Sequence, residues 1–189
     1  MKVEKTALEG VVVITPERHG DARGWMVESY SQEALRAQGV AQVFVQENHS
    51  FSARRGTLRG LHFQRRPRAQ DKLVRVVTGA VLDVAVDVRR GSPTFGRHVA
   101  VELTAANDRQ LLVPKGFAHG FVTLSDDTQV LYKVSDSYAP ELEAGLAWDD
   151  PDVAIAWPFA QGQISAKPRD LAWPRLGDVD SGFRFDDMG

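Results

Sequence analysis

Short runs of apolar residues that alternate with polar residues recur through much of the chain, and they limit the possible folds more than any other feature. They span 11–15, 43–48, 58–64, 72–88, 97–103, 109–114, 120–124 and 129–135. Thr78-Gly79 predicts a turn inside the longest run, and RRGSP, TAAND and PKG separate others. Many short strands at even spacing are typical of an antiparallel sandwich or barrel, so we expect an all-β fold.

The chain has 189 residues, which fits a single domain spanning residues 1–189. We expect a barrel core over about 40–136. One short helix is predicted before it, capped by Ser31 and stopped by Gly39. From about 137 to 189 the sequence is richer in Pro and Trp and only weakly periodic, which indicates a C-terminal elaboration packed on the barrel with short helical turns.

Composition excludes several classes of protein. A net charge of -2 gives no electrostatic footprint for nucleic acid. There is no cysteine, which excludes disulfides, a thiolate nucleophile and a thiolate zinc site. The N-terminal segment carries acidic residues and only a four-residue apolar run, so we expect neither a signal peptide nor a membrane span, and a cytoplasmic location.

Polar residues inside the predicted strands are the candidates for a ligand site, because barrels of this kind bind ligands at their mouth. His62 stands in the run RGLHFQ. Lys72 shares a strand face with apolar residues and either enters the barrel or extends to its edge. Asp83 is either exposed or orients a histidine. His119 and Tyr132 could equally be structural, the tyrosine as core filling.

The pattern Pro-x-Gly-x-x-His at 114–119 resembles the second motif of the cupin superfamily. Metal-binding cupins usually pair it with His-x-His and a glutamate, whereas this chain offers His62 followed by Gln64. Imidazole, lysine and glutamine make a poor shell for a transition metal. We therefore expect no metal, and we interpret His62 as a proton carrier.

Six segments together resemble one family, the dTDP-4-dehydrorhamnose 3,5-epimerases and related deoxysugar epimerases. In chain order they are GDARGWMVESY (20–30), FVQENHS (44–50), TLRGLHFQ (57–64), KLVRVVTGAVLDVAVDVRRGSPTFG (72–96), RQLLVPKGFAHGFVTLSD (109–126) and LYKVSDSY (131–138). The resemblance covers about residues 3–175. It implies a cupin-like jelly roll that forms a strand-exchanged homodimer.

The resemblance also implies a reaction. The family acts without a cofactor on dTDP-4-keto-6-deoxy-D-glucose and inverts carbons 3 and 5 by removing and returning protons. The family's base matches His62, the aspartate that holds it matches Asp170, and the cation that stabilises the enolate matches Lys72. Tyr132 matches the acid that protonates the opposite face of the sugar.

Other positions match the family's substrate contacts. These are Arg23, Glu28, Gln46, Asn48, Arg59, His119, Tyr138, Glu143 and Lys167. The two arginines match the positions that bind the diphosphate, and Tyr138 matches the tyrosine that stacks on thymine. In the family the GDARG segment serves the neighbouring subunit's site.

The chain departs from the family pattern near its C-terminus. The family's aspartate directly follows a lysine, whereas here Pro168 and Arg169 separate Lys167 from Asp170. Asp170 keeps its spacing to the following proline, so we interpret the pair as an insertion. Asp83 is the other carboxylate that could serve His62.

Two further details of the sequence raise structural questions. Met26 stands where relatives often carry an aromatic residue, which leaves the shape of the sugar pocket open. Arg59 and His62 fall on opposite faces of a regular strand, so they line one pocket only if Gly60 permits a bulge.

Three alternatives to double epimerisation are open at this stage. An enzyme that inverts only carbon 3 or only carbon 5 would need the same base. A non-catalytic sugar-nucleotide-binding barrel would need no paired acid and base. A metal-dependent cupin oxygenase or isomerase is disfavoured by Gln64.

Overall fold

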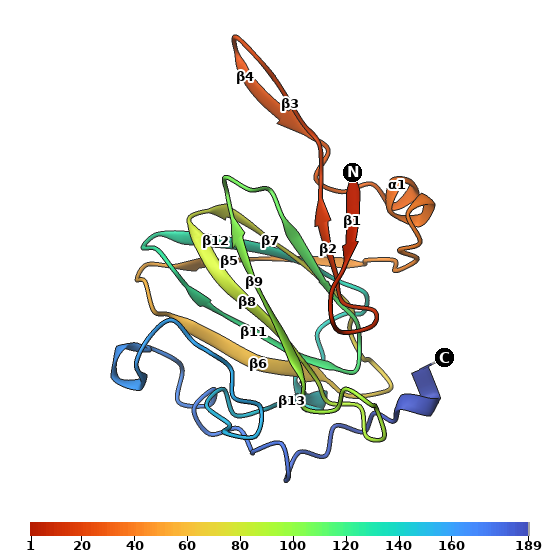
Figure 1. Ribbon diagram of the computed structural model, residues 1–189, viewed down its shortest axis with the longest axis vertical. Coiled ribbons are helices and arrows are strands. Elements are labelled where there is room, and N and C mark those ends of the chain that lie inside the picture. The colour runs from red at the N-terminus through yellow and green to blue at the C-terminus, as the bar shows by residue number, and fades with distance from the viewer. Residues whose placement is uncertain (189) are drawn as a thin grey trace.

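The computed structural model describes residues 1–188, and most of its strands form two antiparallel sheets that face each other (Figure 1). In spatial order the six-stranded sheet contains β1 (Lys2–Lys5), β2 (Val12–Thr15), β10 (Gln110–Val113), β7 (Lys72–Thr78), β12 (Thr128–Val134) and β5 (Gln46–Ser52). The five-stranded sheet contains β13 (Glu143–Gly145), β6 (Leu58–Gln64), β11 (Phe117–Thr123), β8 (Ala80–Asp87) and β9 (His98–Thr104). The predicted all-β jelly roll is confirmed, as two sheets that do not close into one barrel.

The main core lies between the two sheets. Alternation along β7 buries Val74 and Val76, and β11 contributes Phe117 and Phe121 to the same cluster. Fully burying such a side chain contributes roughly 1.5–3 kcal/mol. Figure 1 shows β7 and β11 in the two facing layers, so the sheet faces that form the core also form the walls of any cavity between them.

A second core lies on the outer face of the five-stranded sheet. There Leu61, Phe63 and Val84 pack against the C-terminal segment, which contributes Leu146 and Phe183. Strands β6 and β8 are therefore buried on both faces, which explains why the β8 sequence VLDVAV is nearly continuously apolar.

The C-terminal segment crosses that outer face with little regular structure, as the blue trace of Figure 1 shows. Its short 3-10 helices are η1 (Pro140–Leu142), η2 (Gln161–Gln163) and η3 (Phe185–Met188). These turns lie within the predicted C-terminal elaboration.

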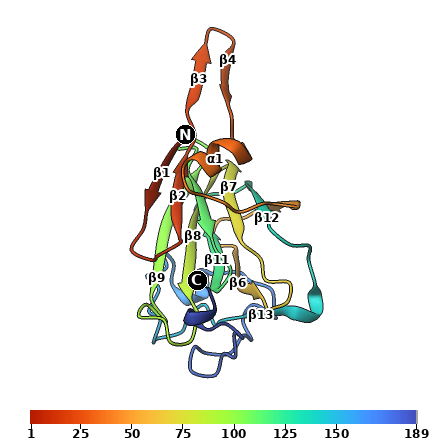
Figure 2. The same cartoon turned by 90° about the vertical axis from the view of Figure 1, so that its right-hand side faces the viewer.

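The N-terminal region contains the predicted helix and an unpredicted hairpin. Helix α1 (Gln32–Ala37) begins where the Ser31 hydroxyl accepts a hydrogen bond from the Ala34 amide, as expected for an N-cap. Strands β3 (Arg18–Asp21) and β4 (Gly24–Val27) form a hairpin that extends away from the body in both views (Figures 1 and 2). Its Trp25 and Met26 are 58% and 67% exposed.

Most predicted strands are confirmed within a residue or two, and the turn after Thr78 is confirmed by the β7–β8 junction at Gly79, whose φ is 80°. Three limits were wrong. Strand β5 spans Gln46–Ser52 rather than 43–48, and β11 begins at Phe117 rather than 120. No helix in residues 1–188 is long and apolar enough to span a membrane.

Candidate active site

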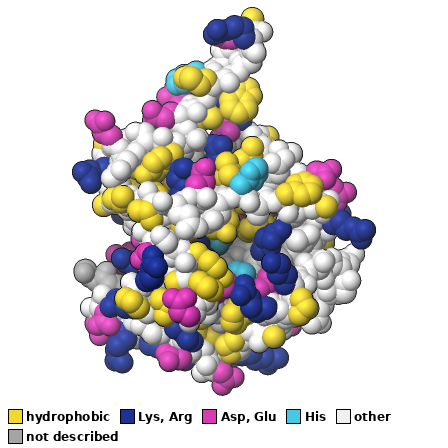
Figure 3. Space-filling view, turned by 180° about the vertical axis from the view of Figure 1, so that it is seen from behind, with side chains coloured by type: hydrophobic (Ala, Val, Ile, Leu, Met, Phe, Trp, Pro, Cys, Tyr) yellow, Lys and Arg dark blue, Asp and Glu magenta, His cyan; other side chains and the backbone are white. Residues whose placement is uncertain are grey.

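A cavity of about 690 Å³ opens between the two sheets and gathers most of the predicted site residues. Of the thirteen positions predicted from the sequence, eleven line it; they are Gln46, Asn48, Arg59, His62, Lys72, His119, Tyr132, Tyr138, Glu143, Lys167 and Asp170. Figure 3 shows histidine side chains inside a hollow with lysine and arginine side chains around it. The volume is in the range of small-molecule sites.

The centre of the site is a histidine–carboxylate pair. His62 projects from β6, and its Nε2 lies 2.8 Å from Oδ1 of Asp170 on the C-terminal segment. Asp170 is 2% exposed, and the Gly60 amide also donates to its Oδ2 at 3.4 Å. Burial acts to raise the pKa of the Asp170 carboxyl, but the hydrogen bond and charge of His62 hold it below its ordinary value. The carboxylate beside His62 is therefore Asp170, not Asp83.

A bulge in β6 brings Arg59 and His62 to the same cavity. His119 of β11 pairs with His62, and Phe121 pairs with Arg59, so two β6 residues stand opposite one β11 residue between the pairs. Gly60 has a φ of 119°, and a Cβ there would lie 2.6 Å from the Gly120 Cα. Only glycine fits this position, and the expected bulge is confirmed.

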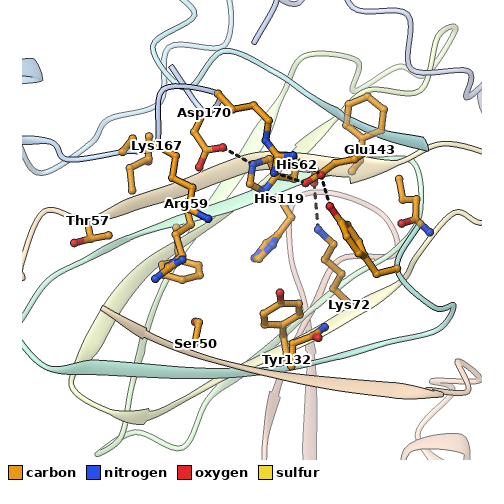
Figure 4. A pocket seen from close by; sticks show the side chains of 18 of the residues that line it. Ser50, Thr57, Arg59, His62, Lys72, His119, Tyr132, Glu143, Lys167 and Asp170 are labelled. Atoms are coloured by element: carbon orange, nitrogen blue, oxygen red, sulfur yellow. Dashed lines mark hydrogen bonds and ion pairs between the residues drawn. The ribbon is translucent and has the colours of Figure 1, made fainter. Parts of the chain in front are cut away.

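Lys72 and Tyr132 come from the opposite sheet, on β7 and β12. Figure 4 shows Tyr132 facing His62 across the cavity, with Lys72 reaching in between. The Lys72 Nζ donates to the His62 carbonyl oxygen at 3.3 Å. Burial lowers the pKa of Lys72 to about 8, although the charges of Glu143 and Asp83 oppose the shift. Burial also raises the pKa of Tyr132, so its hydroxyl keeps its proton at neutral pH.

A second histidine–carboxylate pair adjoins the first. His119 Nε2 lies 2.8 Å from Oδ1 of Asp83, which is fully buried. Of the two interpretations of Asp83, an exposed residue or one that orients a histidine, the second holds. The histidine that it contacts is His119. The other carboxylate oxygen of Asp83 has no hydrogen-bond partner among residues 1–188.

The rim of the cavity carries a polar network that the sequence predicted only in part. Tyr138 Oη donates to Glu143 at 2.7 Å, and the Arg169 guanidinium donates to both oxygens of Glu143 at 2.8 and 3.0 Å. Arg169 lines the cavity together with Lys167. The sequence predicts Arg169 to be part of an insertion, yet this arginine directly precedes Asp170, where the family pattern places a lysine.

Comparison with known proteins agrees with this geometry. The family profile described as dTDP-4-dehydrorhamnose 3,5-epimerase matches residues 5–178. The chain belongs to this family of isomerases. An epimerase of that name from Salmonella typhimurium is 50% identical over 178 residues, covering 93% of this chain and 96% of the relative.

Solved structures of two relatives carry nucleotide sugars. The dTDP-6-deoxy-D-glucose-3,5-epimerase of Legionella pneumophila, in complex with dTDP-4-keto-L-rhamnose, is 42% identical with a TM-score of 0.92 and covers 97% of this chain and 98% of that one. ChmJ, a 3'-monoepimerase of Streptomyces bikiniensis in complex with dTDP-quinovose, is 36% identical with a TM-score of 0.84. The match covers 92% of this chain and 87% of ChmJ. Both activities therefore occur on this fold.

Two predicted ligand contacts of the epimerase lie outside the cavity of their own chain. The Arg23 side chain is 91% exposed at the tip of the β3–β4 hairpin, where it pairs with Asp21. Glu28 is also exposed, just beyond β4. Met26 lies on the same hairpin, so it does not shape the sugar pocket of its own chain.

Gln64 of the epimerase has a structural role where a metal-binding cupin would have a ligand. Its side-chain amide donates to the backbone oxygens of Arg68 and Ser137, and its carbonyl oxygen accepts from the Ala139 amide. Within residues 1–188, no three His, Asp or Glu side chains gather as a metal site would require. Metal independence remains a prediction for experiment.

Proposed function

We propose that this epimerase converts dTDP-4-keto-6-deoxy-D-glucose to dTDP-4-keto-L-rhamnose by inverting carbons 3 and 5, without a cofactor. One observation carries the proposal. The carboxylate-backed His62 and the protonated hydroxyl of Tyr132 enter the cavity from opposite sheets, with Lys72 between them. Inversion at carbon needs a base and an acid on opposite faces of the sugar.

His62 is the base in this proposal. Because its Nε2–H donates to Asp170, Nδ1 carries the free lone pair and takes the proton from the carbon beside the ketone. The carboxylate fixes this tautomer and stabilises the imidazolium that forms. A positioned base of this kind contributes typically ~10²–10⁴-fold to the rate.

Lys72 stabilises the charge that develops. As the C–H bond breaks, its electron pair moves toward the ketone, whose oxygen becomes an enolate. The Lys72 ammonium is available to that oxygen, because its pKa of about 8 leaves it mostly protonated at pH 7. Tyr132 then gives its proton to the opposite face of the same carbon. To complete the cycle, the His62 imidazolium releases the abstracted proton to solvent and Tyr132 takes one up from solvent.

The rim residues are suited to the nucleotide half of the substrate. Arg59 supplies a forked cation for the diphosphate, and Tyr138 offers an aromatic face that is 52% exposed at the rim. We infer that Arg23 reaches the site of a second subunit in a strand-exchanged homodimer, because the β3–β4 hairpin carries it away from its own cavity. A cytoplasmic location is part of the same proposal.

Single epimerisation is the second candidate, because ChmJ shares the fold and is called a 3'-monoepimerase. Proton NMR of the substrate in deuterium oxide separates the candidates. Label entering at both carbons supports the 3,5-epimerase, label at one carbon supports the monoepimerase, and no label refutes enzymatic proton abstraction.

The same assay tests the two proton carriers. His62→Ala should abolish exchange at both carbons. Tyr132→Phe removes only the hydroxyl, so His62 should still exchange protons on its own face while net inversion is lost at one carbon at least. Inversion at the wild-type rate in Tyr132→Phe would contradict the assignment of the acid, and exchange in His62→Ala would contradict that of the base.

A further inference from the structure

The carboxylate that serves His62 comes from an irregular segment, not from a sheet. Residues 167–174 carry it, with turn bonds from the Asp170 amide to the Lys167 carbonyl at 2.9 Å and from the Ala172 amide to the Arg169 carbonyl at 3.1 Å. Irregular segments move more than strands. A displacement of about 1 Å at a reacting group can lower a rate roughly 100-fold. The position of Asp170 therefore depends on what holds this segment to the sheet.

Trp173 packs beside His62 in the space that is open because Gly145 has no side chain. Gly145 of β13 pairs directly with His62 of β6, and residues opposite each other in a ladder share one face of the sheet. A Cβ on Gly145 would lie 2.3 Å from Cδ2 of the Trp173 indole. The indole thus takes the place of a side chain at Gly145, and its ring meets the His62 ring edge to face at 5.9 Å between centroids.

The ring of Trp173, not its N–H, holds it there. Its Nε1 is buried and has no hydrogen-bond partner in the part of the chain that the structure describes. The next residue fixes the backbone, because the Pro174 carbonyl accepts from the Ala147 amide at 2.8 Å. The indole contact at Gly145 and the bond to Ala147 attach the 167–174 segment to β13 and to the residues that follow it. Trp173 stands three residues after Asp170, so this attachment lies close to the carboxylate.

We propose that Trp173 is a positioning residue for the His62–Asp170 pair. Its indole limits the movement of the imidazole on one side and anchors the segment that carries the carboxylate on the other. Trp173 is not among the residues that line the cavity, so it acts through the pair and not on the substrate. The inference rests on the base role proposed for His62.

The variants Trp173→Ala and Trp173→Phe test it, with Leu171→Ala as the control. Leu171 lies on the same segment but is 56% exposed. Deuterium exchange into the substrate measures proton abstraction, and calorimetry measures dTDP affinity. We expect Trp173→Ala to slow exchange roughly 10–100-fold while its Kd for dTDP stays within about two-fold of wild type. Trp173→Phe and Leu171→Ala should stay close to wild type.

A double-mutant cycle with Asp170→Asn separates positioning from general damage. If Trp173 acts through the pair, Asp170→Asn should slow the Trp173→Ala enzyme much less than it slows the wild type. If the rate losses of the two single variants multiply in the double variant, the proposal is overturned. It is also overturned if Trp173→Ala exchanges at the wild-type rate, or if Trp173→Phe loses as much exchange rate as Trp173→Ala. If Trp173→Ala does not fold, Trp173→Leu takes its place in the same cycle with the same criterion.

The controls distinguish this inference from the proposed function. Absence of exchange in the wild type, or exchange that persists in His62→Ala, refutes the base role itself. Normal wild-type exchange, loss in His62→Ala and full activity in Trp173→Ala refute only the role of Trp173.

Discussion

Replacing Lys72 with methionine should make the fold more stable while removing activity. The Lys72 amine is held in a site that favours its neutral form, because burial lowers its pKa from the ordinary 10.5 to about 8. Methionine has a similar length, adapts to irregular surroundings and carries no charge to desolvate. The substitution therefore removes an unfavourable contribution to folding together with the group that we propose stabilises the enolate.

The magnitude follows from the two pKa values. The difference between 10.5 and about 8 corresponds to about 3 kcal/mol of destabilisation at pH 7, where lysine is charged in both the folded and the unfolded chain. This is an upper limit, because Lys72 borders the cavity and is only partly buried. Between pH 8 and 10.5 the unfolded chain keeps its proton and the folded chain loses it, so wild-type stability rises with pH and the advantage of methionine disappears.

Denaturant unfolding of wild type and Lys72→Met at pH 7 and again near pH 10 measures this difference, at equal protomer concentration. Lys115→Met, at an exposed lysine, is the matched control and should stay within about 0.5 kcal/mol of wild type. A Lys72→Met protein that is less stable than wild type at pH 7, or equally more stable at both pH values, would refute the reasoning.

Three further outcomes are expected. Arg59→Ala and Arg23→Ala should each weaken dTDP binding by about 1.5–3 kcal/mol in calorimetry, since each removes charge-assisted bonds to phosphate; unchanged affinity in both would contradict the proposed anion site. The epimerisation rate should fall as pH rises through about 8, because Lys72 then loses the charge that stabilises the enolate; a flat profile from pH 7 to 9.5 would argue against this. Exhaustive chelation should leave turnover unchanged, and activity that vanishes and returns with zinc, iron or manganese would show a metal requirement.

The sequence predicted the centre of the site better than its edges. His62, Lys72 and Tyr132 lie on regular strands, where period-two alternation and the family motifs both indicate position. Gly60 could be singled out because alternation failed there, and the bulge at that residue explains the failure. Apart from that bulge, local pattern and tertiary structure agree in these strands.

Residues on irregular segments were harder to assign. Arg169 and Trp173 belong to a stretch without periodicity, so nothing in the sequence indicates which side chains face the sheet. The place of Trp173 depends on the absent side chain of Gly145, a relation between distant segments that only the folded chain shows. The β3–β4 hairpin also lacks a clear alternation, because both of its strands are largely exposed.

The bond between His62 and Asp170 joins residues 108 positions apart, and this separation sets an order of events during synthesis. A ribosome adds roughly 5–20 residues per second, so the histidine is made roughly 5–20 s before its carboxylate. Strands β5 to β12 are complete before Asp170 is translated. A nascent chain can therefore form both walls of the cavity before Asp170 is made, and His62 gains its carboxylate partner only when the C-terminal segment docks.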